Sequence, residues 1–268
     1  MTKNLLISRL APTPSGYLHL GNLMNFTITW SLIRRQRGQL YLRIDDGDVQ
    51  RTRDEYRQDI EETLHWLGFE WDKVLPTQSS QTESYWQWLQ HLPHYACDCS
   101  RKSLEARGVM RGYDGFCRSR NLPYTAGLSQ LRLHSHSPQN DLVIWRKENL
   151  PAYQLACVVD DLQSGVNLIV RGEDLRESSE FQKEIAQLAG KAGSAFHKIK
   201  FIHHPLLVGP EGEKLSKSKD DLSLKAMRES GKRPKDIFKL LGQQLKLGDE
   251  TESLQDFLKI DWNKMDWA

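Results

Sequence analysis

The sequence predicts an α/β protein built on a doubly wound parallel sheet, and three observations predict it. Short apolar strands alternate with helical stretches through the first 70 or so residues. A stretch over residues 93–150 breaks this alternation and carries three of the four cysteines. Regular structure resumes near residue 153 and passes, after residue 219, into charged and amphipathic sequence. Alternating strands and helices with short connections are typical of a parallel sheet, so we expect a Rossmann-type sheet, an insertion and a short helical C-terminal appendage.

The first strand and helix are predicted from apolar periodicity. Asn4–Leu10 is expected to form a buried strand, followed by a loop rich in proline and glycine. Leu20–Arg37 is expected to form a helix that ends at Gly38 as its C-cap. Gln39–Ile44, rich in large apolar residues, is the second expected strand.

Later elements are predicted in the same way. Thr52 and Glu55 have the spacing of a capping box at the start of a second helix. Tyr153–Asp161 and Leu168–Arg171 resemble strands, and Ser178–Ala189 a helix. The expected organisation is a first half of the sheet domain (1–92), an insertion (93–150), a second half (151–219) and the helical appendage (220–268).

Composition excludes several classes of protein. The chain has 268 residues, of which 38% are hydrophobic, and 37 basic residues against 35 acidic ones leave a net charge of +2. Such values are typical of a globular protein. No apolar run approaches the roughly 20 residues that span a membrane, and the N-terminal apolar stretch is short for a signal peptide. We therefore expect a cytoplasmic protein without a membrane partner, and four cysteines are too few for a disulfide scaffold.

The segment from Arg9 to Asn22 combines a strand end, a Pro/Gly loop and a helix start. The N-terminus of a helix presents unpaired N–H groups and a positive partial charge, which suit a phosphate. His19 can donate a hydrogen bond to a phosphate oxygen, and Gly21 permits close approach of a nucleotide. The alternative is an ordinary turn with a surface histidine.

A second motif lies far along the chain, where Lys214, Lys217 and Lys219 follow a glycine-bearing stretch. Lysines in such a loop can neutralise the charge that builds on a leaving pyrophosphate. Taken alone, the segment is better explained as a solvated basic loop.

Cys97, Cys99 and Cys117 lie close together in the sequence, which predicts a zinc site in the insertion. A fourth ligand must come from elsewhere, and Tyr113, Asp98, His94 and water are candidates. The alternative is a set of reduced cysteines without metal. Six basic residues against two acidic ones between positions 101 and 120 suggest either a surface for an RNA end or a solvated face.

Together, the segment from Arg9 to Asn22 and the lysine motif resemble the paired signature of the class I aminoacyl-tRNA synthetases. Four segments, residues 9–16, 42–46, 153–161 and 170–174, resemble the glutamate-specific branch. The resemblance implies that Arg9 and Arg171 bind carboxylates of glutamate, that Asp45 faces its ammonium group, and that Tyr153 closes the pocket. Glutamyl enzymes usually have Glu at the position of Asp45, whereas glutaminyl enzymes have Asp there. The alternative for Arg9 and for Arg171 is a structural salt bridge. The complete implied sets are Arg9, Ala11, Thr13, Asp45, Tyr153 and Arg171 for glutamate, His19, Gly21, Asn22 and Lys217 for ATP, and His19, Lys214 and Lys217 for catalysis.

The cysteine spacing, with Tyr113 as the fourth zinc ligand, resembles one offshoot of this branch, the glutamyl-queuosine tRNA(Asp) synthetases. That resemblance implies partners ATP with Mg²⁺, L-glutamate and tRNA(Asp) carrying queuosine, and a structural Zn²⁺; we also expect a monomer. About 49 residues follow Lys219, where glutamyl-tRNA synthetases continue into an anticodon-reading domain. Two alternatives are a truncated glutamyl ligase with another acceptor and a catalytically silent tRNA-binding paralogue.

Overall fold

The computed structural model describes residues 5–207, 223–248 and 250–262, and divides the chain into two compact units. The first unit comprises residues 1–77, 166–176 and 200–268, and the second comprises residues 78–165 and 177–199. The lysine motif at Lys214, Lys217 and Lys219 lies outside the described residues.

Two small parallel sheets lie side by side in the first unit. β1 (Ile7–Leu10), β2 (Gln39–Leu42) and β3 (Lys73–Val74) are parallel, with Ile7 opposite Gln39 and Leu10 opposite Leu42. β7 (Leu168–Gly172) and β8 (Lys200–His204) form a second parallel pair. β7 lies beside β1, where the Asn167 side chain accepts a hydrogen bond from the Ile7 amide and its backbone N–H donates to the Ile7 carbonyl.

The strand order is therefore β3-β2-β1 and then β7-β8, as expected for a doubly wound α/β sheet. The order reverses between β1 and β7. In such sheets a ligand binds beyond the carboxyl ends of the strands at this switch point. The loops that follow β1, β2 and β7 are thus the first place to look for a site.

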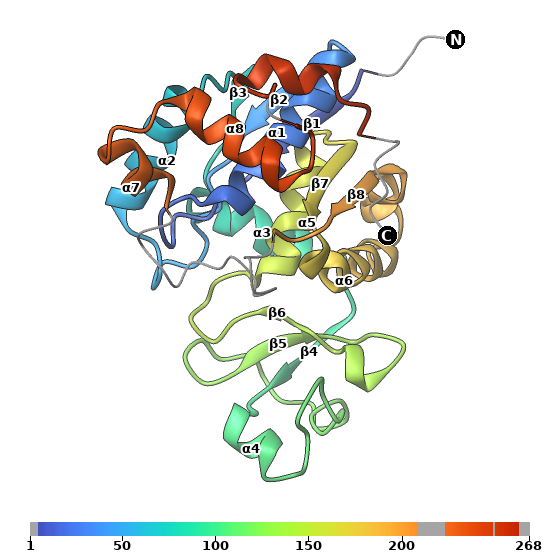
Figure 1. The fold of residues 1–268 in the computed structure, drawn as a ribbon. Coiled ribbons are helices and arrows are strands. Elements are labelled where there is room, and N and C mark those ends of the chain that lie inside the picture. The colour runs from blue at the N-terminus through green and yellow to red at the C-terminus, as the bar shows by residue number, and fades with distance from the viewer. Residues whose placement is uncertain (1–4, 208–222, 249, 263–268) are drawn as a thin grey trace. The chain divides into compact units, whose positions relative to one another are not determined.

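The helices of the first unit come from both ends of the chain. α1 (Leu20–Arg35) and α2 (Asp54–Trp66) belong to the N-terminal part, whereas α7 (Leu224–Glu229), α8 (Pro234–Gln244) and the 3₁₀ helix η6 (Leu254–Lys259) belong to the C-terminal part. Figure 1 shows α8, in red, beside α1, in blue. Buried side chains from all of these helices share one apolar core with the sheet. The predicted appendage is thus helical and packs into the body of the first unit.

The second unit contains an antiparallel sheet and several helices. β4 (His94–Cys97), β5 (Gln130–Leu133) and β6 (Val143–Trp145) pair in sequence order, and all three lie within the stretch predicted as an insertion. The α-helices of this unit are α3 (Thr82–Leu89), α4 (Arg101–Glu105), α5 (Tyr153–Gln163) and α6, which begins in the first unit (Arg176–Leu188). Besides η6, the described residues form the 3₁₀ helices η1 (Gln78–Gln81), η2 (Pro138–Asn140), η3 (Glu173–Leu175) and η4 (Gly190–Lys198).

The prediction of a strand over Tyr153–Asp161 is wrong, because these residues form α5. Every residue from Leu155 to Asp161 is buried, and the five residues Leu155–Val159 are all apolar, so this part of the helix shows no alternation in the sequence. A short, uniformly apolar run does not distinguish a buried strand from a buried helix.

Two predicted helix ends are also wrong in detail. The helix expected to begin at a Thr52–Glu55 capping box begins at Asp54, because the Thr52 hydroxyl donates to the Asp48 carbonyl in the preceding turn. At the end of α1, Arg37 adopts the left-handed conformation with φ 52°, while Gly38 donates to the Ile33 carbonyl. Gly38 is required for space, since a Cβ there would lie 2.4 Å from the Leu6 carbonyl oxygen.

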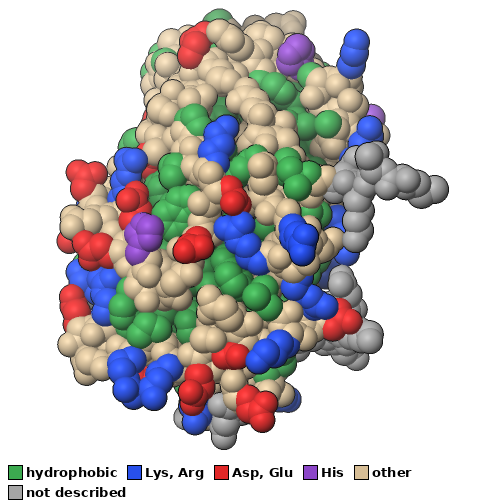
Figure 2. Space-filling model, turned by 90° about the horizontal axis from the view of Figure 1, so that it is seen from above, with side chains coloured by type: hydrophobic (Ala, Val, Ile, Leu, Met, Phe, Trp, Pro, Cys, Tyr) green, Lys and Arg blue, Asp and Glu red, His purple; other side chains and the backbone are tan. Residues whose placement is uncertain are grey.

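Among the described residues, no helix combines the length and apolar character needed to cross a membrane. Figure 2 shows basic and acidic side chains interspersed on the face that it presents, in keeping with the small net charge.

Candidate functional site

The loops that leave β1 and β2 run side by side beyond the strands. The Arg43 amide donates to the Leu10 carbonyl at 2.9 Å, and the Asp45 amide donates to the Pro12 carbonyl at 3.0 Å. Sheet-like pairing therefore continues into the loops and fixes the segment that carries Ala11 and Thr13. Ala11 is half-buried and Thr13 is exposed.

His19 is the N-cap of α1, and its ring folds back onto the first turn. Its Nδ1 accepts a hydrogen bond from the Gly21 amide at 3.0 Å, and its own amide donates to Asn22 Oδ1 at 3.1 Å. Because Nδ1 is an acceptor, the proton of the neutral imidazole lies on Nε2, where it can be donated. The first turn of α1 contains no acidic residue, so the N-terminus of this 16-residue helix is suited to an anion.

Arg9 and Arg171 lie near the carboxyl ends of the adjacent strands β1 and β7. Both are buried, with 6% and 4% of their surface exposed. The Arg171 guanidinium lies over the Phe201 ring of β8, 5.4 Å from its centroid. β1 and β7 flank the switch point, so both arginine residues lie near the edge of the sheet at which such folds bind ligands.

Asp45 follows β2 and forms a buried ion pair with Arg43, which was not predicted from the sequence. Arg43 Nε donates to Asp45 Oδ1 at 2.6 Å, and a terminal nitrogen of Arg43 donates to Oδ2 at 3.2 Å. Residues two apart in extended backbone point to the same side, so the spacing of Arg43 and Asp45 was the signal that could have revealed the pair. Arg43 thus fixes the orientation of the Asp45 carboxylate.

The structure places the other predicted residues in different regions. Gly21 and Asn22 belong to the first turn of α1 with His19. Tyr153 is the first residue of α5, is 44% exposed, and belongs to the second unit. Ser223, the first described residue after the lysine motif, forms an isolated β-bridge with His19.

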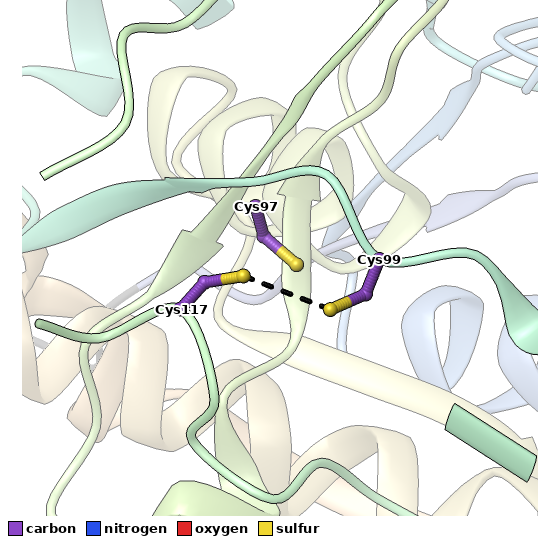
Figure 3. Close-up of side chains that lie close together, drawn as sticks. All are labelled: Cys97, Cys99 and Cys117. Atoms are coloured by element: carbon purple, nitrogen blue, oxygen red, sulfur yellow. Dashed lines mark hydrogen bonds between the residues drawn. The ribbon is translucent and has the colours of Figure 1, made fainter. Parts of the chain in front are cut away.

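Cys97, Cys99 and Cys117 come together in the second unit, as the sequence predicts. Their sulfur atoms all lie within 4.8 Å of one another and point toward a common centre (Figure 3). The sulfurs of Cys99 and Cys117 are 3.6 Å apart, and the Tyr113 hydroxyl lies 3.5 Å from the Cys97 sulfur and 3.7 Å from that of Cys99. Cys157 is buried in α5.

The distance between the Cys99 and Cys117 sulfurs, and those from the Tyr113 hydroxyl to the Cys97 and Cys99 sulfurs, are close to the distances of a tetrahedral metal site. A tetrahedral zinc ion, with bonds of about 2.3 Å to sulfur and about 2.0 Å to oxygen, requires roughly 3.8 Å between sulfurs and roughly 3.5 Å between oxygen and sulfur. Of the candidates for the fourth ligand, Tyr113 is buried and its hydroxyl lies near two of the sulfurs, whereas an oxygen of the more exposed Asp98 lies 3.5 Å from the Cys117 sulfur. Asp98 is bound by Arg120 through both carboxylate oxygens, and His94 bonds through Nδ1 to the Leu92 carbonyl.

The protonation of the cluster is strongly perturbed. Burial opposes ionisation of Cys97, but hydrogen bonds with Tyr113 and Arg132 lower the pKa of its thiol to about 7. Burial raises the pKa of the Cys117 thiol to about 11. Burial and hydrogen bonds with Cys117 and Cys97 raise the pKa of Tyr113. The cluster is therefore not a set of ordinary surface thiols.

Several arginines of the basic stretch are engaged inside the second unit. The pairs are Arg107 with Asp114, Arg118 with Asp141 and Arg120 with Asp98, with shortest distances of 2.6, 2.6 and 2.8 Å. Paired guanidiniums leave less positive charge for an RNA phosphate than the sequence count suggests.

The chain belongs to the family of class I tRNA synthetases (E and Q), whose catalytic domain model matches residues 6–120 and 130–265. Among its relatives, the glutamyl-Q tRNA(Asp) synthetase of a Synechococcus strain is 37% identical over 238 residues, which cover 83% of this chain and 77% of the relative. The Parasynechococcus marenigrum protein of the same name is also 37% identical, over 255 residues that cover 90% of this chain and 83% of the relative.

Solved structures agree in fold. The glutamate-tRNA synthetase of Elizabethkingia anophelis has a TM-score of 0.81 at 22% identity, and the match covers 99% of this chain and 67% of that structure. A glutamate tRNA ligase from Elizabethkingia meningosepticum has a TM-score of 0.76 at 23% identity, covering 98% of this chain and 66% of that structure. The α/β architecture is thus that of a class I synthetase catalytic domain.

Proposed function

We propose that this protein is an ATP-dependent ligase that activates glutamate as glutamyl-adenylate and transfers the glutamyl group to queuosine in tRNA(Asp). The observation that carries the proposal is the likeness to glutamyl-Q tRNA(Asp) synthetases over most of their length and of this chain. The buried pair Arg9 and Arg171 at the switch point supports an anionic amino acid as the substrate.

In this proposal the glutamate site is built on the carboxyl edge of the first unit's sheet. Arg9 and Arg171 bind the carboxylates of glutamate, because a planar guanidinium can bind a carboxylate through two parallel hydrogen bonds. Asp45, oriented by Arg43, receives the ammonium group. Ala11 and Thr13 belong to the loop that leaves β1, and a role for Tyr153 rests on the family resemblance alone.

ATP binds at the N-terminus of α1 in this proposal. Gly21 and Asn22 lie in the first turn, and the Nε2 proton of His19 is donated to a phosphate oxygen. Lys214 and Lys217 neutralise the charge of the leaving pyrophosphate. Mg²⁺ is expected with ATP and would shield the phosphate charges.

In the proposed reaction the protein mainly aligns the reacting groups. A carboxylate oxygen of glutamate attacks the α-phosphorus of ATP, the bond to the bridging oxygen breaks, and pyrophosphate leaves. A hydroxyl of queuosine then attacks the activated carbonyl carbon, AMP leaves, and the hydroxyl proton is lost to solvent. The arginines and His19 contribute positioning and charge stabilisation, because the adenylate is already a reactive acyl donor.

We also propose that Cys97, Cys99, Cys117 and Tyr113 hold one structural Zn²⁺, which would tie β4 to the loop that carries Tyr113 and Cys117. The support is the grouping of the three sulfurs within 4.8 Å, together with the Cys99–Cys117 and Cys97–Tyr113 distances, which are close to those of tetrahedral coordination.

Pyrophosphate exchange into ATP tests the activation step. We expect exchange with glutamate and not with glutamine, and without any tRNA present. Arg171→Met should lower kcat/KM for glutamate by roughly a hundredfold or more, because loss of one partner of a buried charge pair costs about 3–5 kcal/mol.

The alternatives predict other outcomes. A preference for glutamine would indicate that Asp45 marks a glutaminyl type of site. Absence of all exchange would favour a catalytically silent tRNA-binding protein. Exchange with glutamate but no transfer to tRNA(Asp) would favour a ligase with a different acceptor.

A further inference from the structure

Each sulfur of the cysteine cluster contacts a nitrogen of a different arginine. The nitrogen-to-sulfur distances are 3.2 Å for Arg132 with Cys97, 3.5 Å for Arg107 with Cys99 and 3.4 Å for Arg120 with Cys117. The three arginines come from separate places in the sequence: the turn after α4, the loop after Cys117 and strand β5. The predicted zinc ligands do not by themselves explain why one arginine contacts each sulfur. The proposed glutamate and ATP sites do not explain it either.

The two outer arginines are held in place by carboxylates. Arg107 binds both oxygens of Asp114 at 2.6 and 3.2 Å, and Arg120 binds both oxygens of Asp98 at 2.8 and 3.2 Å. Both guanidiniums also lie over the Phe116 ring, at 4.3 Å for Arg107 and 5.0 Å for Arg120 from its centroid. The carboxylates therefore restrict the conformations of both guanidiniums, so that contact with the sulfurs costs little additional conformational entropy.

The third arginine is buried. Arg132 is 7% exposed, donates to the Asp141 carbonyl at 2.6 Å, and lies over the Tyr113 ring at 3.9 Å. It thus touches two of the groups expected to bind the metal, the sulfur of Cys97 and the ring of Tyr113.

We propose that Arg107, Arg120 and Arg132 are positioning residues of the metal centre, which orient the three sulfurs and set how tightly the protein holds a divalent, thiophilic cation. The inference rests on the metal site proposed above. Charge supports it. Three thiolates around a divalent cation carry −1, and three guanidiniums with the carboxylates of Asp98 and Asp114 carry +1, so the whole centre is neutral when Tyr113 keeps its proton.

Metal affinity is the direct test. The full chain is stripped with a chelator and titrated with Co²⁺, whose thiolate charge-transfer absorption reports binding, and with Zn²⁺ in competition with a chromophoric chelator. We expect Arg107→Met and Arg120→Met each to weaken both affinities by about tenfold, and the double variant by about a hundredfold, as for other groups that hydrogen-bond to metal ligands. The charge-transfer intensity per bound Co²⁺ should stay that of three thiolates.

Arg111→Met is the matched control. Arg111 belongs to the same stretch and its loss changes the charge equally, but its side chain is 90% exposed and pairs with Glu177 at 3.5 Å. This variant should bind both metals within twofold of the parent. Arg132→Met is expected to lose the most affinity, but the two exposed arginines provide the decisive comparison because a buried substitution can prevent folding.

Two results would overturn the inference. One is a double variant that binds metal as tightly as Arg111→Met does. The other is a double variant, Asp98→Asn/Arg120→Met, that binds metal as tightly as the parent. In that case the loss of metal affinity in Arg120→Met would be due to the Asp98 carboxylate, which loses its partner in that variant, and not to the missing arginine. A parent protein that binds neither Co²⁺ nor Zn²⁺ would instead contradict the metal site itself, and with it the role of the arginines.

Discussion

At the scale of single residues, Gly21 shows how one missing side chain shapes the proposed ATP site. The His19 ring occupies the space that a Cβ on residue 21 would need: such an atom would lie 2.9 Å from Cε1 and 3.0 Å from Nδ1 of His19. The same ring nitrogen accepts the Gly21 amide proton. Glycine at this position therefore determines where the Nε2 proton of His19 is presented.

Gly21→Ala should displace the His19 ring and lower kcat of glutamate-dependent pyrophosphate exchange by about ten- to a hundredfold, the range for loss of one charge-stabilising donor. The melting temperature should change little, because alanine is a better helix former than glycine. A variant with parent-like exchange would show that the position of the ring does not matter for activation.

Arg43 and Asp45 form a second pair of interdependent residues. Both side chains are almost completely buried, at 1% and 5% exposure, and they share two hydrogen bonds. Arg43→Met would leave the Asp45 carboxylate buried without its cation, so we expect the free energy of unfolding to fall by about 3–5 kcal/mol. Urea denaturation measures this change, and a loss below about 1 kcal/mol would contradict a tight pair.

At the scale of elements, Asp141 joins separate segments of the second unit. It lies just before β6, and its carboxylate accepts two hydrogen bonds of 2.6 Å from Arg118, one of 3.0 Å from the Ser135 amide and one of 2.5 Å from the Tyr95 hydroxyl. Burial opposes ionisation, but these hydrogen bonds hold the pKa of Asp141 below its ordinary value of 3.8.

A lowered pKa in the folded state makes stability depend on pH in a definite direction. The stabilisation by Asp141 is complete above its unfolded pKa of about 3.9 and is lost as the pH falls through the folded value. Asp141→Asn should lower the free energy of unfolding at pH 7 by about 3 kcal/mol. Below about pH 4, the free energy of unfolding of this variant should fall less with decreasing pH than that of the parent. Denaturation at pH 7 and pH 3 tests both statements; a variant with the parent's stability at pH 7 would contradict them.

The elements also show what a sequence can and cannot predict. The segments of β1, β2 and α1 were predictable because their apolar pattern and breakers agree with the final structure. α5 was mistaken for a strand because its residues from Leu155 to Asp161 are all buried, so this run shows no helical alternation of apolar and polar residues. The cysteine cluster was predictable from spacing, whereas Arg132 was not, because its contact with Cys97 depends on the pairing of β4 with β5.

At the scale of the whole molecule, the C-terminal segment is part of the first unit's core. Phe257 of η6 is fully buried, and its ring is parallel to that of Trp262 at 6.3 Å between centroids. η6 packs against α1, and Arg228 of α7 pairs with the buried Asp59 of α2 at 2.8 Å. The segment expected to be an appendage therefore supports the helix that carries His19 at its start.

Phe257→Ala should therefore destabilise the protein by about 3–5 kcal/mol, the usual cost of deleting a buried aromatic ring. Gln255→Ala, on the exposed side of the same 3₁₀ helix, is the control and should change stability by less than about 0.5 kcal/mol. Equal effects of the two substitutions on thermal unfolding would show that η6 is not part of the core.

The position of the transferred glutamate on the tRNA tests the central claim most directly. The protein is incubated with labelled glutamate, ATP, Mg²⁺ and tRNA(Asp), prepared with and without queuosine, and the RNA is then digested to nucleosides. We predict label on the queuosine nucleoside and none on tRNA(Asp) that lacks it. Label on the 3′-terminal adenosine, or equal labelling of the two preparations, would contradict the proposed function.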